Sequence, residues 1–244
     1  MTAPRVSVII PAFNDLLLTQ QCLSSIQLAT DQPHEILLVD NASTDGTGRF
    51  PWPKPVQVIK NETNRGFAAA CNQGMRVALG DVFVLLNNDT MVPPGWLRML
   101  LAHLEDPSVG IVGPTLSRAG GVQEVRATYE TYAEFWTIAV ERAAQYAGQG
   151  ETVPLLSGAC WMLRAETVRA VGLLDERFVP GMFEDNDYCL RVRMAGNTLR
   201  WAKDVYVHHE ALQGFRQLAD PYQSILERNQ ARFREKWDLG RYGI

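Results

Sequence analysis

The sequence has no apolar stretch approaching the roughly 20 residues that a membrane-spanning helix needs. The apolar run near its start ends at Pro11 and has neither the length nor the cleavage site of a signal peptide. Its four cysteines are scattered and form no CxxC pair, which favours reduced, buried thiols. We therefore expect a cytoplasmic chain that is soluble, or at most peripheral at the inner face of the cell membrane.

A net positive charge and a glycine-rich nucleotide loop are also missing. The formal net charge is -4 at pH 7, so the chain lacks the basic surface expected of a protein that grips nucleic acid phosphates. No G-x-G-x-x-G fingerprint follows the first expected strand, which argues against a dinucleotide-dependent oxidoreductase. The Gly-rich, basic loop of a sugar nucleotidyltransferase is missing from the same place.

What the chain does contain is an alternation of short apolar runs and helical patterns. Its 244 residues, of which 46% are apolar, suffice for a sizeable core, and we expect one domain over residues 1–244. The alternation predicts βαβ units in an α/β fold, a single Rossmann-like, doubly wound, mixed sheet that is mostly parallel and flanked by helices. Strands are expected at 6–10, 35–40, 56–60, 82–87, 109–113 and 160–164, and helices at 16–28, 66–79, 95–104, 184–196 and 224–237.

Polar residues gather where the expected strands end, which is where open α/β sheets bind ligands. Asp40 directly follows a strand, where it could bind a base or ribose or, equally, cap the next turn. Asp89 ends another, where a carboxylate and donor phosphates could hold Mg²⁺ or Mn²⁺, the alternative being a plain polar turn. The other candidates at these ends are Pro11, Ala12, Phe13, Asn14, Asn87 and Asn88.

Further candidates stand at helix starts and near the end of the chain. The segment from Asn64 through Gly66 to Asn72 could present amides to a ribose or phosphate, although a simple turn explains it as well. Three acids, Glu184, Asp185 and Asp187, open a helix; capping explains one or two of them, and one could be a general base.

The adjacent histidines His208 and His209 lie on an extended segment, so their side chains point to opposite sides and only one could reach a metal. Residues 117–154 contain an aromatic, helical stretch that packs on the core or, alternatively, forms an acceptor or membrane contact. The basic residues of the last helix, Arg228, Arg232, Arg234 and Lys236, either face solvent or dock on an anionic membrane.

Taken together, these segments resemble glycosyltransferase family 2, the inverting enzymes with the GT-A fold, and especially its rhamnosyltransferase-like branch. The resemblance spans roughly residues 5 to 215 and rests on VSVIIPAFN, EILLVDNASTDGT, NRGFAAACN, VFVLLNND, LSGACWMLR, FEDNDYCLR and VHHE, in family order. It implies a nucleotide-sugar-binding half at 1–115, an acceptor and catalytic half at 116–215 and a C-terminal helix at 216–244.

The resemblance also implies roles for the candidates. Asp185 would be the catalytic base, with Glu184 as its neighbour and Asp187 as the fallback, and Asp89 with His208, or else His209, would hold Mg²⁺ or Mn²⁺. The sequence departs from the familiar DxD motif because Asn87 replaces its first Asp. Ser157, Gly158 and Ala159 would lie beside the acceptor. The donor would be bound by Pro11, Ala12, Phe13, Asn14, Asp40, Asn64, Gly66, Asn72, Asn87 and Asn88.

The sequence thus predicts a metal-dependent hexosyltransferase that inverts the anomeric centre. Its expected donor is a dTDP- or UDP-sugar, and its expected acceptor is a hydroxyl of a glycan or lipid-linked glycan in cell-surface polysaccharide or glycolipid synthesis. The departure at Asn87 leaves an alternative, a catalytically silent nucleotide-sugar-binding subunit or scaffold with the same fold.

Overall fold

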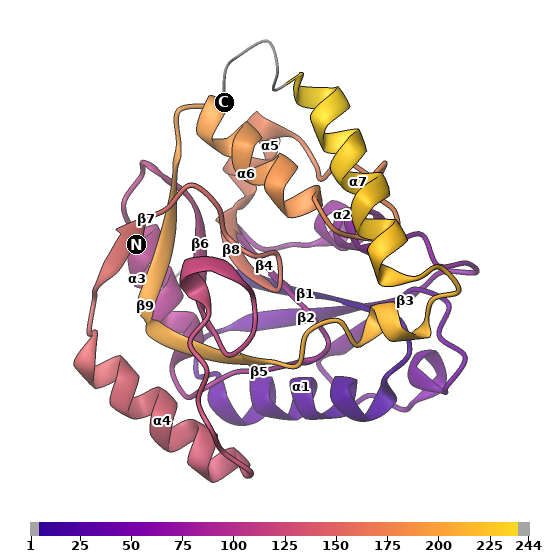
Figure 1. Ribbon diagram of the computed structural model, residues 1–244. Coiled ribbons are helices and arrows are strands. Elements are labelled where there is room, and N and C mark those ends of the chain that lie inside the picture. The colour runs from indigo at the N-terminus through magenta and orange to yellow at the C-terminus, as the bar shows by residue number, and fades with distance from the viewer. Residues whose placement is uncertain (1–4, 239–244) are drawn as a thin grey trace.

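The computed structural model describes residues 5–238, which fold around a nine-stranded mixed sheet (Figure 1). The strand order is β3-β2-β1-β4-β8-β6-β9-β5, with β7 paired to β9. This is the α/β architecture that the sequence predicts, and the prediction of a single mixed sheet flanked by helices is confirmed.

The first half of the chain is a parallel, doubly wound layer. Strand β1 pairs with β2 on one side and β4 on the other, and β2 pairs with β3. Register places Ala12 opposite Asp40, so the carboxyl ends of these strands share one edge of the sheet. The elements are β1 (Val6–Ala12), α1 (Leu16–Ala29), β2 (His34–Asp40), η1 (Thr47–Arg49), β3 (Val56–Lys60), α2 (Phe67–Val77) and β4 (Val82–Leu86).

The second half makes the sheet mixed. Strand β8 runs antiparallel between β4 and β6, whereas β6 and β9 are parallel. The long β9 also pairs antiparallel with β5 and β7. The remaining elements are β5 (Thr90–Met91), α3 (Trp96–Leu104), β6 (Val109–Leu116), η2 (Gly121–Gln123), α4 (Tyr132–Gln145), β7 (Gly150–Thr152), β8 (Cys160–Arg164), α5 (Ala165–Val171), α6 (Glu184–Met194), β9 (Thr198–His209), η3 (Gly214–Gln217) and α7 (Tyr222–Trp237).

Alternate residues of the buried strands pack on opposite faces of the sheet. Val8 belongs to a core formed with α1 and α3, whereas the adjacent Ile9 belongs to a core formed with α2, α5 and α6. Both faces are therefore apolar, which is why the strands appear as continuous apolar runs in the sequence. All four cysteines are free and buried, as expected, and burial raises the pKa of Cys22 to about 12.

Helix α4 lies beside β9, apart from the helices that cover the sheet (Figure 1). Its Phe135 is fully buried and packs against Tyr206 of β9, with ring centroids 6.0 Å apart. Trp136 donates a hydrogen bond from Nε1 to the Val92 carbonyl, at 3.2 Å. The aromatics of this excursion are therefore a small core of their own, which supports the packing interpretation.

Helix α7 turns most of its basic side chains toward the protein. Arg228 pairs with Asp220 at 3.0 Å, and Lys236 lies 2.8 Å from Asp175. Arg232 donates to the Arg177 carbonyl at 2.7 Å. These three side chains bind other parts of the protein, which neither the solvent-facing nor the membrane-docking alternative anticipated. Within residues 5–238, no helix has the length and apolarity to cross a bilayer.

Candidate active site

A cavity of about 510 Å³ opens at the carboxyl ends of β1 and β4. It collects side chains from strand ends, from the start of α6 and from the segment after β9, which lie far apart in the sequence. Of the residues predicted from the sequence, those that line it are Pro11, Ala12, Phe13, Asn64, Asn87, Asn88, Asp89, Ser157, Gly158, Ala159, Glu184, Asp185 and His209.

Asn87, Asp89 and His209 converge on one wall of this cavity. Pairing of β5 with β9 sets Thr90 opposite His209, which brings the end of β9 beside the turn after β4. The Nε2 atom of His209 lies 3.4 Å from Asp89 Oδ1 and 3.3 Å from Asn87 Nδ2. Its Nδ1 atom lies 2.7 Å from the Arg118 carbonyl, so Nδ1 carries the proton and a neutral ring presents Nε2 to the cavity.

The oxygen and nitrogen atoms of this wall suit a divalent cation. The amide oxygen of Asn87 is buried without a hydrogen-bond partner, and Asp89 is 7% exposed. A carboxylate, an amide oxygen and an imidazole are ligands that Mg²⁺ or Mn²⁺ accepts, with donor phosphates completing the shell. Among residues 5–238 no group of three or more His, Cys, Asp or Glu could hold a metal, so such a site depends on Asn87 and on the donor.

The carboxylate of Asp89 raises the pKa of its neighbour His209. Burial favours the neutral imidazole, but the hydrogen bond and negative charge of Asp89 outweigh it and raise the pKa of His209. A divalent cation at this wall would be held by Asp89 and by the neutral form of His209, and it would favour loss of the second proton of the ring.

His208, the histidine first expected at the metal, points the other way. Its Nδ1 atom contacts the Tyr129 hydroxyl, and its Nε2 atom lies 3.1 Å from Glu210. It is absent from the cavity wall, and burial lowers its pKa. Since neighbouring residues of a strand face opposite sides, His209, the other alternative from the sequence, is the histidine that faces the cavity.

Glu184 and Asp185 enter the cavity from the first turn of α6. The carboxylate of Asp185 accepts hydrogen bonds from the amides of Asn186, at 2.8 Å, and Gly158, at 3.2 Å. A side chain on residue 158 would place Cβ only 3.3 Å from Asp185 Cβ, so a glycine there allows the close approach.

Glu184 and Asp185 are neighbouring carboxyls whose pKa values depend on burial and, for Glu184, on the charge of Asp185. Burial raises the pKa of both, and the charge of Asp185 raises that of Glu184 further, well above its usual range. Two backbone amides stabilise the ionised form of Asp185, whereas Glu184 Oε2 is buried without a partner. We therefore assign the negative charge of the pair to Asp185.

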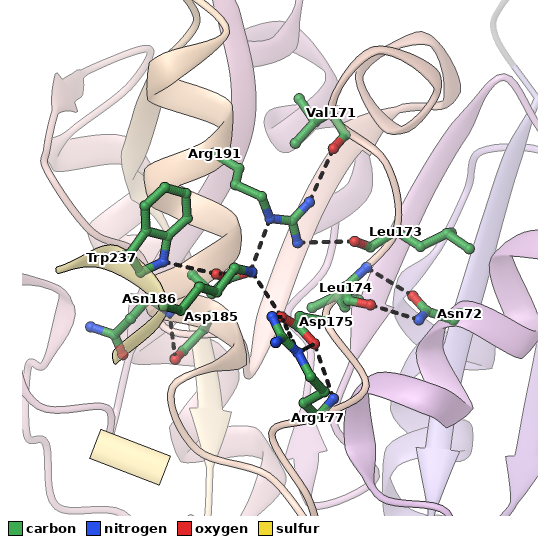
Figure 2. Close-up of polar contacts among 12 residues, drawn as sticks. Asn72, Val171, Leu173, Leu174, Asp175, Arg177, Asp185, Asn186, Arg191 and Trp237 are labelled. Carbon is green, nitrogen blue, oxygen red and sulfur yellow. Dashed lines mark hydrogen bonds and ion pairs between the residues drawn. The ribbon is translucent and has the colours of Figure 1, made fainter. Parts of the chain in front are cut away.

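Asp187, the fallback base, is held away from the cavity. Its side chain is fully buried and lies 2.9 Å from Arg191 Nε and 2.5 Å from Lys236 Nζ. It also accepts a hydrogen bond from Trp237 Nε1 at 3.0 Å. Arg191 in turn donates to the carbonyls of Val171 and Leu173 (Figure 2). This geometry makes Asp187 a structural anchor, and it corrects the fallback assignment.

Asn14 and Asp40, both predicted to bind the donor, are engaged in turns and do not line the cavity. Asp40 accepts a hydrogen bond from the Ser43 amide at 3.1 Å, and Asn14 accepts one from the Thr44 amide at 2.8 Å. The capping interpretation of Asp40 is the one its contacts support.

Gly66 and Asn72 are likewise structural in their contacts. Asn72 binds both polar backbone groups of Leu174, donating to the carbonyl at 2.9 Å and accepting from the amide at 3.0 Å (Figure 2). Gly66 has φ +85°, and a Cβ there would lie 3.2 Å from the Pro180 carbonyl oxygen. Both residues fix the segment that leads to α6, behind the cavity wall.

Sequence reasoning assigned no role to several cavity residues. Asn41 follows the predicted Asp40, and Phe67 follows the predicted Gly66, so the sequence already indicated a binding site next to each of them. Others come from segments that only the fold brings near, among them Arg118, Arg126, Pro180 and Met182 of loops, Phe215 of η3 and Tyr222 at the start of α7.

The sequence of the chain is similar to those of known proteins. The family model described as "Glycosyl transferase family 2" matches residues 7–172. The chain belongs to that family. Glycosyltransferase AglE of Haloferax volcanii is 26% identical over 86% of this chain and 68% of that protein. O-antigen biosynthesis protein RfbC of Myxococcus xanthus is 31% identical over 85% of this chain but only 17% of that protein.

Solved structures agree in fold with this member of glycosyl transferase family 2. GalNAc-T7, crystallised with UDP, GalNAc and Mn²⁺, is 19% identical with a TM-score of 0.75, covering 96% of this chain and 49% of that one. Mannosyltransferase PcManGT of Pyrobaculum calidifontis, in complex with GDP-Man and Mn²⁺, is 23% identical with a TM-score of 0.63, covering 86% of this chain and 58% of that one. Apart from AglE, the chain spans less than two thirds of these relatives.

Proposed function

We propose that this chain is an inverting, divalent-metal-assisted glycosyltransferase. It moves a hexose from a UDP- or dTDP-sugar to a hydroxyl of a glycan or lipid-linked glycan in cell-surface polysaccharide or glycolipid synthesis. One observation carries the proposal: the Asp185 carboxylate lines the same cavity as Asn87, Asp89 and His209. That cavity therefore offers a base and an oxygen-rich cation site together.

The Asn87, Asp89 and His209 wall would bind the leaving group. A divalent cation held there supplies the positive charge that stabilises a departing nucleoside diphosphate. Asp89 is almost fully buried, so its charge is little screened by water. The Arg118 carbonyl keeps His209 in the tautomer that turns Nε2 toward the cavity.

Asp185 would take the proton of the acceptor hydroxyl. As the acceptor oxygen forms its bond to the anomeric carbon, the bond to the diphosphate oxygen breaks and the hydroxyl proton passes to Asp185. Burial raises the pKa of Asp185, which strengthens it as a base, while the Gly158 and Asn186 amides hold its oxygens in place. A single displacement of this kind inverts the anomeric centre.

The relatives support the substrate class. The two solved structures hold UDP and GDP-Man, a nucleoside diphosphate and a nucleoside-diphosphate sugar, each with Mn²⁺. The RfbC relative is an O-antigen biosynthesis protein, which supports a cell-surface glycan as the acceptor.

The test of the proposal is a direct assay of sugar transfer from donor to acceptor. The protein is incubated with UDP- and dTDP-hexoses, a panel of glycan and lipid-linked acceptors, and Mn²⁺, Mg²⁺ or EDTA, and the product is analysed by NMR. We expect a product of inverted anomeric configuration that EDTA abolishes. A product that retains the donor configuration would contradict the mechanism.

A silent nucleotide-sugar-binding protein is the competing candidate, favoured by Asn87 in place of an acid. Such a protein would bind UDP with Mn²⁺ in calorimetry yet give neither transfer nor Mn²⁺-stimulated donor hydrolysis, and Asp185→Asn would change nothing.

A further inference from the structure

Helix α7 packs against the segment that delivers Glu184 and Asp185 to the cavity. In Figure 1, α7 is the yellow helix beside the orange α6. The rings of Phe233 in α7 and Phe183, the residue before α6, lie 5.6 Å apart. The contact joins the last described helix to the backbone immediately ahead of the proposed base.

The segment 179–183 is part of the cavity wall and has an unusual backbone. Pro180, Gly181 and Met182 line the cavity. Met182 and Phe183 have φ values of 77° and 71°, in the left-handed region that non-glycine residues rarely adopt. Backbone of this kind persists only where surrounding contacts hold it, so something must restrain the segment.

Asn229 of α7 supplies such contacts. Its side-chain amide donates to the Gly181 carbonyl at 2.7 Å and to the Val179 carbonyl at 3.4 Å. Its oxygen accepts a hydrogen bond from Arg232 at 2.9 Å. Asn229 is fully buried, and asparagine is a poor residue for a helix interior. Burying its amide costs free energy unless the amide is hydrogen-bonded, and these hydrogen bonds offset that cost.

A second contact holds α7 on the other side of the two acids. Asp187, two residues beyond Asp185, binds Lys236 and Trp237 near the end of the helix. The turn with Glu184 and Asp185 is therefore fixed from both sides by α7, with Asn229 ahead of it and Asp187 behind it.

We propose that Asn229 is a positioning residue, which holds segment 179–183 in its strained conformation and so sets the place of the Asp185 carboxylate in the cavity. The proposal rests on the proposed function, because it assumes that Asp185 is the base. Asn229 touches no substrate; it acts through the carbonyls of Val179 and Gly181.

The principal variant is Asn229→Ala, with Gln230→Ala, the next residue of the same helix, as the matched control. We expect kcat per folded protein to fall by up to about 100-fold in Asn229→Ala, since small displacements of a catalytic group cost this much. The Kd for UDP with Mn²⁺, measured by calorimetry, should change little, because its wall comes from β4 and β9. Hydrogen exchange in peptides covering residues 175–187 should become faster, and Gln230→Ala should match the unmodified protein in all three measurements.

Two results would overturn the proposal. Unchanged exchange in residues 175–187 would show that Asn229 does not restrain the segment, and faster exchange with unchanged kcat would show that the restraint does not position the base. If Asn229→Ala fails to fold, Arg232→Ala removes the donor that orients the Asn229 amide and should give the same pattern more weakly; unchanged exchange and kcat in that variant would also overturn it.

Failure of the proposed function has a different signature. In that case the unmodified protein would show no transfer, or Asp185→Asn would keep the full rate of transfer, whatever Asn229→Ala does, while the exchange measurement would still report on the restraint.

Discussion

Replacing Asp187 by asparagine separates a structural role for the third acid of the motif from a catalytic one. The substitution keeps the shape of the side chain but removes a fully buried negative charge. Arg191 and Lys236, whose side chains are 17% and 21% exposed, then lose their shared partner. Breaking a buried ion pair from one side costs about 3–5 kcal/mol.

The lower end of that range applies here, because Lys236 keeps Asp175 at 2.8 Å. We expect Asp187→Asn to lower the free energy of unfolding by about 3 kcal/mol. In a chain of this length that corresponds to a fall in Tm of roughly 6–12 °C.

Urea denaturation and thermal melting measure the loss of stability, and transfer assays well below the new Tm measure turnover. Turnover per folded molecule should fall far less than in Asp185→Asn. An unchanged Tm, or turnover as low as in Asp185→Asn, would refute the assignment of Asp187 as an anchor.

Three further predictions concern the cavity. His209→Ala should weaken the Mn²⁺-dependent binding of UDP in calorimetry by at least about tenfold, while His208→Ala should leave it nearly unchanged; equal effects would contradict the assignment of His209. Asn87→Asp should tighten Mn²⁺ binding, because a second carboxylate joins Asp89; weaker binding would count against a cation there. Glu184→Gln should raise Tm more at pH 8 than at pH 5. The folded-state pKa of Glu184 lies above its unfolded value, so the unmodified protein loses stability as the pH rises between them; a gain that shrinks with pH would be the wrong sign.

The sheet and the positions of its strand ends could be predicted because local signals coincide there. Apolar runs end at turn residues, and the residues after β1 and β4 do line the cavity. The sequence predicts strand β8 but not its antiparallel direction, because that direction follows from the path of the chain through α4 and β7. An apolar run such as CWMLR carries no information about direction.

The side that a residue faces could not be predicted at the decisive places. His208 and His209 differ only by which of them stands opposite Thr90 across β5 and β9, a long-range register. Asp185 and Asp187 both belong to the first turn of α6, where residues two positions apart point about 200° away from each other. Which of them faces the cavity depends on the tertiary packing of α6, and Arg191 and α7 hold Asp187 on the other side. From the sequence, Asp40 suits a turn cap and a donor-binding residue equally well. Only its hydrogen bond from the Ser43 amide in the folded chain favours the cap.

Single-turnover transfer by Asp185→Asn tests the central claim most directly. Enzyme in excess over UDP- or dTDP-sugar is mixed with acceptor and Mn²⁺, and the same samples are titrated with UDP in calorimetry. We predict a loss of roughly 100-fold or more in the rate of transfer, with the Kd for UDP nearly unchanged. A rate equal to that of the unmodified protein would show that Asp185 is not the base.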